Sequence, residues 1–286
     1  MDTPTTHTLK VPGATLYYET RGSGPVLLLI PGGGADAAVY AAIAPALADA
    51  GYTVVAQDPR GQSRSTLDGP PAGQRPADWA DDACRLLDVV SPHEPAYVLG
   101  CSAGAIVALD LLARHPERVR RVVAHEPPLV EVLEDPAPYR ALFAEVRALF
   151  LEEGGGPAMK RFGEGLGEAR PEREPDEPAP EVREMMPRAY GNMPFFLEHV
   201  LCPFTGTTAD LPALREASAR LVTAAGRDSR PQPALYGPAR RLAELTGAAF
   251  AEFPGGHLGC TERPREFAAR LLEVLDDRER VAAAAR

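Results

Sequence analysis

The sequence lacks the features that would mark a membrane, secreted or nucleic-acid-binding protein. No apolar run approaches the roughly 20 residues needed to cross a bilayer. The first residues show no charged start followed by an apolar stretch, so no signal peptide is visible. The formal net charge of -10 disfavours binding to nucleic acid or to an anionic membrane surface. We therefore expect a cytoplasmic protein with neither kind of partner.

Cysteine is scarce, and its spacing excludes two further classes of protein. The chain has four cysteines, far apart and without a Cys-x-x-Cys pair: Cys84, Cys101, Cys202 and Cys260. Such spacing is typical of reduced thiols and not of a disulfide framework or a zinc site. We expect no metal and no cofactor.

Segments that read as strands alternate with segments of helical periodicity. Residues 25–30 (PVLLLI) and 96–100 (AYVLG) are continuous apolar runs, typical of strands buried on both faces. Further strands are expected at 7–11, 15–20, 52–58, 119–126, 219–226 and 248–253, and helices at about 39–50, 76–90, 102–115, 237–247 and from 264 onward. This alternation predicts an α/β protein, with a mostly parallel sheet covered by helices on both faces.

The middle of the chain departs from this alternation, with helical stretches and no convincing strand. We interpret residues 128–205 as a helical cap inserted into a core formed by residues 1–127 and 206–286. Within the cap, residues from about 163 to 187 are rich in Pro and Glu, which predicts a mobile loop.

Ser102 lies between two glycines where an expected strand meets an expected helix. The run Gly100-Cys101-Ser102-Ala103-Gly104 matches G-x-S-x-G, the nucleophile elbow. Small neighbours are needed because the backbones approach closely at this sharp turn. The helix N-terminus there favours developing negative charge. A serine that only caps the helix is the alternative, but the preceding buried strand favours a nucleophile.

A serine nucleophile needs a base, and the base needs an acid that orients it. In this arrangement the histidine comes last along the chain. His115 lies at a helix end and His199 in the cap, whereas His257 lies in a glycine-rich loop between the last strand and the last helix. We expect His257 to be the general base.

Two acidic residues are candidates for the acid. Asp228 follows the penultimate strand, which is the usual position of the acid in such a fold, and Glu126 follows the strand after the elbow helix. Both lie at the carboxyl ends of strands, and periodicity does not choose between them.

The run Gly32-Gly33-Gly34 follows the first long strand. It resembles the HGGG-type oxyanion loop, with Pro31 in place of its histidine. The Gly33 N–H would join the Ala103 N–H in binding the oxyanion of a tetrahedral intermediate, with Gly32 and Gly34 beside the substrate. A phosphate loop is the alternative, but the patterns of nucleotide-binding loops are missing.

Together these features resemble the capped α/β-hydrolases, and the zearalenone lactonase group most closely. The matching stretches are YYETRGSGP, GYTVVAQDPRGQSRS, GCSAGA, HPERVR and HEPP. The resemblance implies the fold and chemistry of that group, with Ser102 as nucleophile and His257 as base. It also favours Glu126, in the His-Glu-Pro stretch, as the acid, and leaves Asp228 as the alternative.

The cap departs from that group, in which a cap tryptophan contacts the substrate. The only tryptophan here, Trp79, lies outside the cap. The cap offers Phe195, Phe196, His199 and Phe204 instead, either as substrate contacts or as helix-packing residues.

The expected activity is that of a serine hydrolase that cleaves a carboxylic ester or lactone of a mid-sized apolar molecule through an acyl-enzyme. The alternatives are acyl transfer, perhydrolysis or C–C hydrolysis on the same triad, or a non-catalytic ligand-binding protein of this fold.

Overall fold

A computed structural model of the chain describes residues 3–167 and 169–276. Its sheet has nine strands in the order β1-β2-β4-β3-β6-β7-β8-β9, with β5 paired to β2. The pairs of β2 with β1, β4 and β5 are antiparallel, and the others are parallel. The strands are β1 (Thr5–Val11), β2 (Ala14–Arg21), β3 (Val26–Ile30), β4 (Thr53–Gln57), β5 (Thr66–Leu67), β6 (Ala96–Cys101), β7 (Val119–His125), β8 (Leu221–Gly226) and β9 (Ala249–Phe253). The prediction of a mostly parallel α/β sheet is confirmed.

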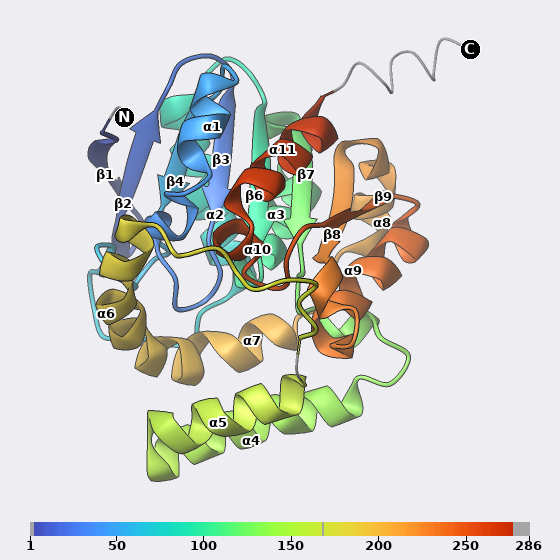
Figure 1. The fold of residues 1–286 in the computed structure, drawn as a ribbon. Helices are drawn as coiled ribbons and strands as arrows, with labels where there is room; N and C mark the ends of the chain where they lie inside the picture. The colour runs from blue at the N-terminus through green and yellow to red at the C-terminus, as the bar shows by residue number, and fades with distance from the viewer. Residues whose placement is uncertain (1–2, 168, 277–286) are drawn as a thin grey trace.

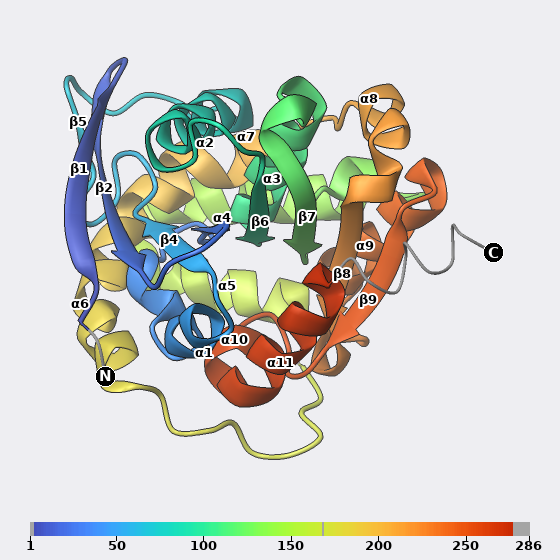
Figure 2. The same cartoon turned by 90° about the horizontal axis from the view of Figure 1, so that it is seen from above.

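Helices cover both faces of this sheet, as Figure 2 shows from above. One face carries α2 (Pro76–Val90), α3 (Ala103–Arg114), α8 (Leu211–Glu216) and α9 (Pro233–Thr246). The other carries α1 (Ala44–Asp49), α10 (Gly259–Glu262) and α11 (Pro264–Leu275). Short 3-10 turns complete the core: η1 (Ala37–Tyr40), η2 (Pro116–Arg118), η3 (Val130–Val132), η5 (Ser218–Arg220) and η6 (Arg227–Ser229).

The central strand β3 shows why its sequence is apolar without interruption. Successive side chains of a strand point to opposite faces. Leu28 and Ile30 pack with α2 and α3, whereas Leu27 and Leu29 pack with α1 and α11. All four are fully buried, so both faces of the strand need apolar residues.

The helix expected at 39–50 is two shorter pieces, η1 and α1. Pro45 lies in the first turn of α1. A proline inside a longer helix would lose a hydrogen bond and clash with the carbonyl four residues earlier, whereas the first turn accepts it.

The segment between η3 and α8 is helical and lies below the strands in Figure 1. Helices α4 and α5 form an antiparallel hairpin, and α6, η4 and α7 follow one another at its side. Their bounds are α4 (Ala137–Glu153), α5 (Gly155–Leu166), α6 (Pro180–Phe195), the π-helical η4 (Phe196–Val200) and α7 (Leu201–Thr205). Within its described residues this segment contains no strand.

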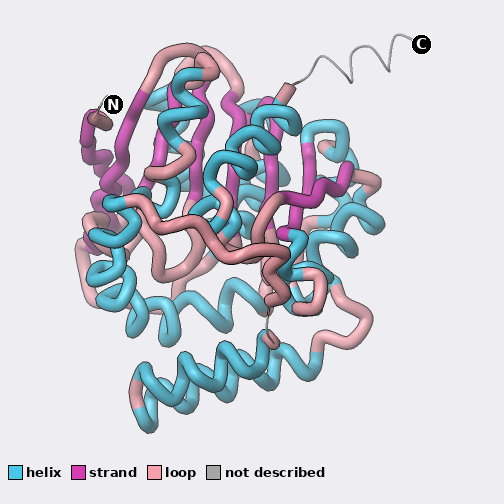
Figure 3. Tube along the Cα trace, in the orientation of Figure 1, coloured by secondary structure: helices cyan, strands magenta, loops and turns pink. Residues whose placement is uncertain are grey.

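The Pro/Glu-rich loop is shorter than the expected 163–187. Helix α5 continues to Leu166, and α6 starts at Pro180, because proline is well tolerated in the first turn of a helix. The loop between them crosses the front of the molecule in Figure 3. It is bonded to the core, since the Arg170 amide donates to the Asp228 carbonyl at 2.9 Å. Its predicted mobility stays a prediction.

All four cysteines are free thiols. In the part of the chain that the structure describes, no helix has the length and hydropathy required to span a bilayer.

Candidate active site

Ser102 occupies a strained turn between β6 and α3. Its φ of +56° and ψ of −123° lie outside the regions that residues other than glycine favour. The Ser102 amide donates to the His125 carbonyl at 2.9 Å, which fixes the turn against β7. The side chain makes no capping hydrogen bond to α3, so the helix-cap interpretation of this serine is wrong.

Two glycines make this turn sterically feasible. A Cβ on Gly100 would lie 2.2 Å from the carbonyl oxygen of Gly104, and a Cβ on Gly104 would lie 2.1 Å from that of Ile30. Both distances are far below van der Waals contact. Any larger residue would therefore push α3 away from the sheet.

His257 and Glu126 are hydrogen-bonded to each other. His257 follows β9, and its Nδ1 lies 2.7 Å from Oε2 of Glu126, which follows β7. Glu126 is fully buried, adopts a φ of +48°, and accepts a second hydrogen bond at Oε1 from the Gly226 amide at 2.8 Å. Because an ionised carboxylate only accepts, Nδ1 carries the proton and Nε2 of the neutral ring is free to accept one.

The surroundings of Glu126 keep it ionised. Burial alone would raise the pKa of this carboxyl group, but the hydrogen bond and charge of His257, together with His125 and the Gly226 amide, outweigh burial and lower the pKa below its ordinary value of 4.5. A buried carboxylate is thus available to orient His257 and to stabilise its cationic form.

The alternative acid, Asp228, makes its hydrogen bonds to groups other than His257. Its Oδ1 accepts a hydrogen bond from the Glu172 amide at 3.3 Å, and its own amide donates to the Gly255 carbonyl at 3.1 Å. Asp228 borders a separate surface hollow beside the loop that precedes α6. The structure therefore brings Glu126, and not Asp228, to the expected base.

Ser102 and His257 line one pocket of about 60 Å³ under the helical segment. The remaining walls are almost entirely apolar and come from the core and from α4, α5, η4 and α7: Ala103, Pro128, Phe143, Phe162, Leu166, Phe196, Leu201, Phe204, Thr205 and Leu235. The only polar side chain among them is Thr205, whose hydroxyl donates to the Leu201 carbonyl at 2.8 Å. The pocket therefore suits an apolar group.

The glycine run lies beside Ser102. A Cβ on Gly32 would lie 3.0 Å from the Ser102 Cβ. No group in the described chain accepts a hydrogen bond from the Gly33 amide, and the Ala103 amide is the first of α3, where no intrahelical acceptor exists. Gly34 differs, because its amide donates to Gln62 and its carbonyl accepts from Asn192.

The expected aromatic contacts of the cap divide into two pairs. Phe196 and Phe204 line the pocket. Phe195 and His199 do not: their rings pack on each other with centroids 5.4 Å apart, and a Cβ on Gly61 would lie 2.7 Å from Phe195. Neither residue lines this pocket, and their contact with substrate stays a prediction.

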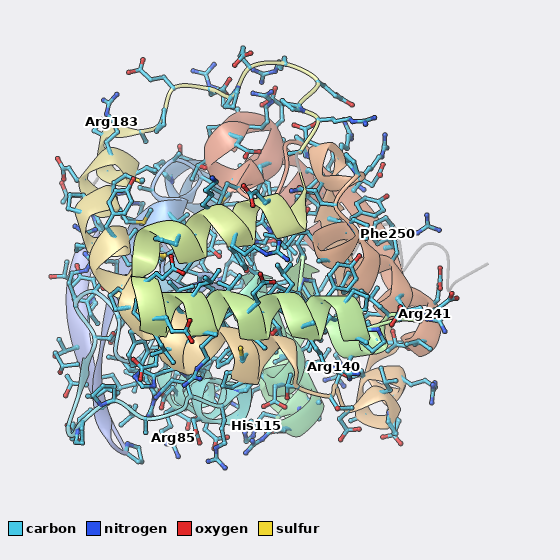
Figure 4. The ribbon with its side chains drawn as sticks, turned by 90° about the horizontal axis from the view of Figure 1, so that it is seen from below. Arg85, His115, Arg140, Arg183, Arg241 and Phe250 are labelled. Atoms are coloured by element: carbon cyan, nitrogen blue, oxygen red, sulfur yellow. The ribbon has the colours of Figure 1, made fainter. Side chains whose placement is uncertain are left out.

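The hairpin of α4 and α5 contributes pocket residues that the sequence reasoning missed. Phe143 comes from α4, and Phe162 and Leu166 come from α5. The sequence predicts helical stretches in this part of the chain, but a helical pattern does not show which side chains face the site. Figure 4 views this hairpin from below, with His115 near the edge of the molecule. His115 is not among the residues that line the pocket.

Comparisons with known proteins assign the family. The alpha/beta hydrolase fold family matches residues 25–164. The hydrolase YraK of Bacillus subtilis is 37% identical over 273 residues, which cover 94% of this chain and 95% of the relative. The chain is an α/β hydrolase.

Other relatives of this hydrolase show the same fold. A zearalenone hydrolase of Bionectria ochroleuca is 32% identical over 130 residues, 43% of this chain and 48% of the relative. A hydrolase from Pseudomonas aeruginosa superposes with a TM-score of 0.71 at 24% identity, covering 94% of this chain and 98% of the other. The resemblance to zearalenone-lactonase-like α/β-hydrolases is confirmed.

Proposed function

We propose that this α/β hydrolase is a serine hydrolase that cleaves a carboxylic ester or lactone of an apolar molecule through an acyl-enzyme. The observation that carries the proposal is the 2.7 Å hydrogen bond from His257 to the buried Glu126, in a site where His257 and Ser102 line the same pocket. An acid, a base and a strained serine so arranged are the parts that acyl transfer requires.

The base and the nucleophile act together in the first step of the reaction. The Nδ1–H of His257 is bonded to Glu126, so Nε2 accepts the Ser102 proton as Oγ attacks the carbonyl carbon. The imidazolium that forms is stabilised by the ionised Glu126. The imidazolium then gives its Nε2 proton to the leaving alkoxide. In the second half-reaction the regenerated neutral imidazole takes a proton from water as the water attacks the acyl-enzyme, and it returns that proton to Ser102 when the ester bond breaks.

The oxyanion of each tetrahedral intermediate would bind the amides of Gly33 and Ala103. Ala103 directly follows Ser102, and Gly33 directly follows Gly32, whose Cβ position lies 3.0 Å from the Ser102 Cβ. The helix N-terminus of α3 adds a favourable dipole. Backbone donors fixed before the reaction need no reorganisation as charge develops.

The pocket and the relatives together indicate the substrate class. Its walls offer phenylalanine and leucine side chains and no charged group other than the catalytic set, which favours an apolar acyl or lactone moiety. Relatives named zearalenone hydrolase support a lactone among the candidates. We assign residues 128–205 the role of a cap over the core, because α4, α5, η4 and α7 close the pocket from outside.

The test is hydrolysis of p-nitrophenyl esters and of simple lactones by the purified chain and by Ser102→Ala. We expect the variant to lose activity by at least about 10³-fold, and to lose labelling by a fluorophosphonate. Near-unchanged activity of Ser102→Ala would overturn the proposal.

A further inference from the structure

Asn192, the only asparagine in the chain, joins the cap to the oxyanion loop. It lies on α6 and is 6% exposed. Its Nδ2 donates to the Gly34 carbonyl at 3.0 Å and to Ser63 Oγ at 2.8 Å, and its Oδ1 accepts from the Ser63 amide at 2.7 Å. Both amide protons and the oxygen are therefore used, which is unusual for a side chain that only fills space.

The Gly34 carbonyl that Asn192 bonds belongs to the Gly34–Ala35 peptide. The N–H of that peptide donates to the Gly32 carbonyl at 3.3 Å, and the Gly32 carbonyl shares a peptide with the Gly33 N–H, the proposed oxyanion donor. The Gly34 amide is bonded to Gln62 Oε1 at 2.7 Å, and the Gly34 carbonyl to Asn192, so the peptide groups on both sides of Gly34 have fixed orientations. Gly33 precedes it, and glycine peptides rotate with little steric cost. Fixing Gly34 removes the freedom that would otherwise let the Gly33 amide turn away from Ser102.

A second contact holds the same helix to the same loop. Arg188, one turn before Asn192 on α6, pairs with Asp36 at 2.6 Å, two residues after Gly34. The backbone at Ser63 is strained, with a φ of +50°. Asn192 thus holds this strained turn and the glycine run together, and it does so from the cap and not from the core.

We propose that Asn192 is a positioning residue that orients the Gly33 amide in the oxyanion hole through Gly34, so that the hole is complete only when α6 is docked. The inference rests on the proposed function, since it concerns the same reaction. It goes further by making one cap side chain control the rate of the chemical step without touching the substrate.

The experiment compares Asn192→Asp and Asn192→Ala with the wild type on p-nitrophenyl butyrate. The aspartate is isosteric but cannot donate when ionised, so the Gly34 bond is lost without a change in volume. We expect kcat to fall about 10- to 100-fold, less than for complete loss of one oxyanion donor, while KM changes by less than about threefold. Affinity for a trifluoromethyl ketone, which forms an oxyanion on Ser102, should fall by the same factor as kcat.

The pH profile separates positioning from a purely structural role. A protonated carboxyl group can donate again, so the kcat of Asn192→Asp relative to wild type should recover as the pH falls towards 5, whereas that of Asn192→Ala should not. The matched control is Met185→Ala on the same helix, which removes a buried apolar contact and leaves the hydrogen bonds in place. It should lower Tm with kcat and inhibitor affinity unchanged.

The outcomes distinguish the two proposals. If wild-type protein neither hydrolyses esters nor reacts with a fluorophosphonate, the proposed function fails. If the wild type is active and Asn192→Asp keeps its kcat, or if Met185→Ala loses kcat equally, the positioning role of Asn192 is wrong and the serine mechanism stands.

Discussion

Glu126 and His257 are 131 positions apart in the chain, and their side chains meet at 2.7 Å. The sheet order brings them together, because β8 lies between β7, which leads to Glu126, and β9, which leads to His257. At the end of β8, the Gly226 amide donates a hydrogen bond to Glu126. A Cβ on Gly226 would lie 2.5 Å from the Gly255 carbonyl oxygen. The loop that carries His257 can therefore lie this close to β8 only because residue 226 is a glycine.

The first prediction concerns the acid. We expect Glu126→Gln to lower kcat by about 10³- to 10⁴-fold, because the amide no longer stabilises the imidazolium or selects the Nδ1–H tautomer. Asp228→Asn should leave kcat nearly unchanged, since Asp228 bonds a loop amide and not His257. Steady-state kinetics on one ester measures both variants. The opposite ranking would show that the acid follows β8 after all.

The second prediction is a pH dependence of stability. The pKa of Glu126 is lowered in the folded chain, so the unfolded chain binds this proton more readily. The stabilisation from ionised Glu126 is therefore fully present above its ordinary pKa of 4.5, and it is lost as pH falls from there through the folded-state pKa.

Urea unfolding between pH 6 and pH 3 measures this effect. Other carboxyl groups also titrate in this range, so the informative quantity is the stability of wild type minus that of Glu126→Gln. This difference should shrink below about pH 4.5. A difference that stays constant, or grows, as the pH falls would contradict the lowered pKa.

Much of the core follows from local sequence. Apolar runs such as residues 25–30 are typical of strands buried on both faces, as β3 is. The G-x-S-x-G turn needs Gly100 and Gly104 for the steric reason given above. Local sequence does not choose between Glu126 and Asp228 as the acid, because both follow parallel strands of the same sheet. Residue patterns do not show which loop bends towards His257, and the resemblance to a known group favoured Glu126.

The helical segment over the pocket shows why its lining residues could be predicted only in part. Phe195 and Phe196 are adjacent in the chain, yet only Phe196 lines the pocket. The π-helical turn of η4 starts at Phe196 and changes the residue spacing along one face. A regular helical pattern therefore does not separate Phe195 and His199, which lie outside the pocket, from Phe196, which lines it.

A third prediction tests the pocket wall. Phe162→Ala on α5 should enlarge the pocket and shift kcat/KM towards longer acyl chains, because this ring lies in the apolar wall and packs against Phe143 and Phe196. The control is Met159→Ala on the same helix, which is 37% exposed and outside the pocket. A series of p-nitrophenyl esters from acetate to decanoate measures the preference. An equal shift in both variants, or none in Phe162→Ala, would exclude this wall as a determinant of chain length.

The fourth prediction tests the close approach of α3 to β3. In Gly104→Ala the added methyl group would lie 2.1 Å from the Ile30 carbonyl oxygen and 2.5 Å from that of Pro31. Neither backbone group can move without displacing β3 or the loop after it, so we expect a loss of at least about 3 kcal/mol in the free energy of unfolding.

The control is Gly191→Ala. Gly191 lies in α6 with open space around its Cβ position, and alanine there should stabilise the helix by up to about 1 kcal/mol. Urea unfolding of both variants decides, and a Gly104→Ala protein as stable as wild type would mean that α3 and β3 are farther apart than described.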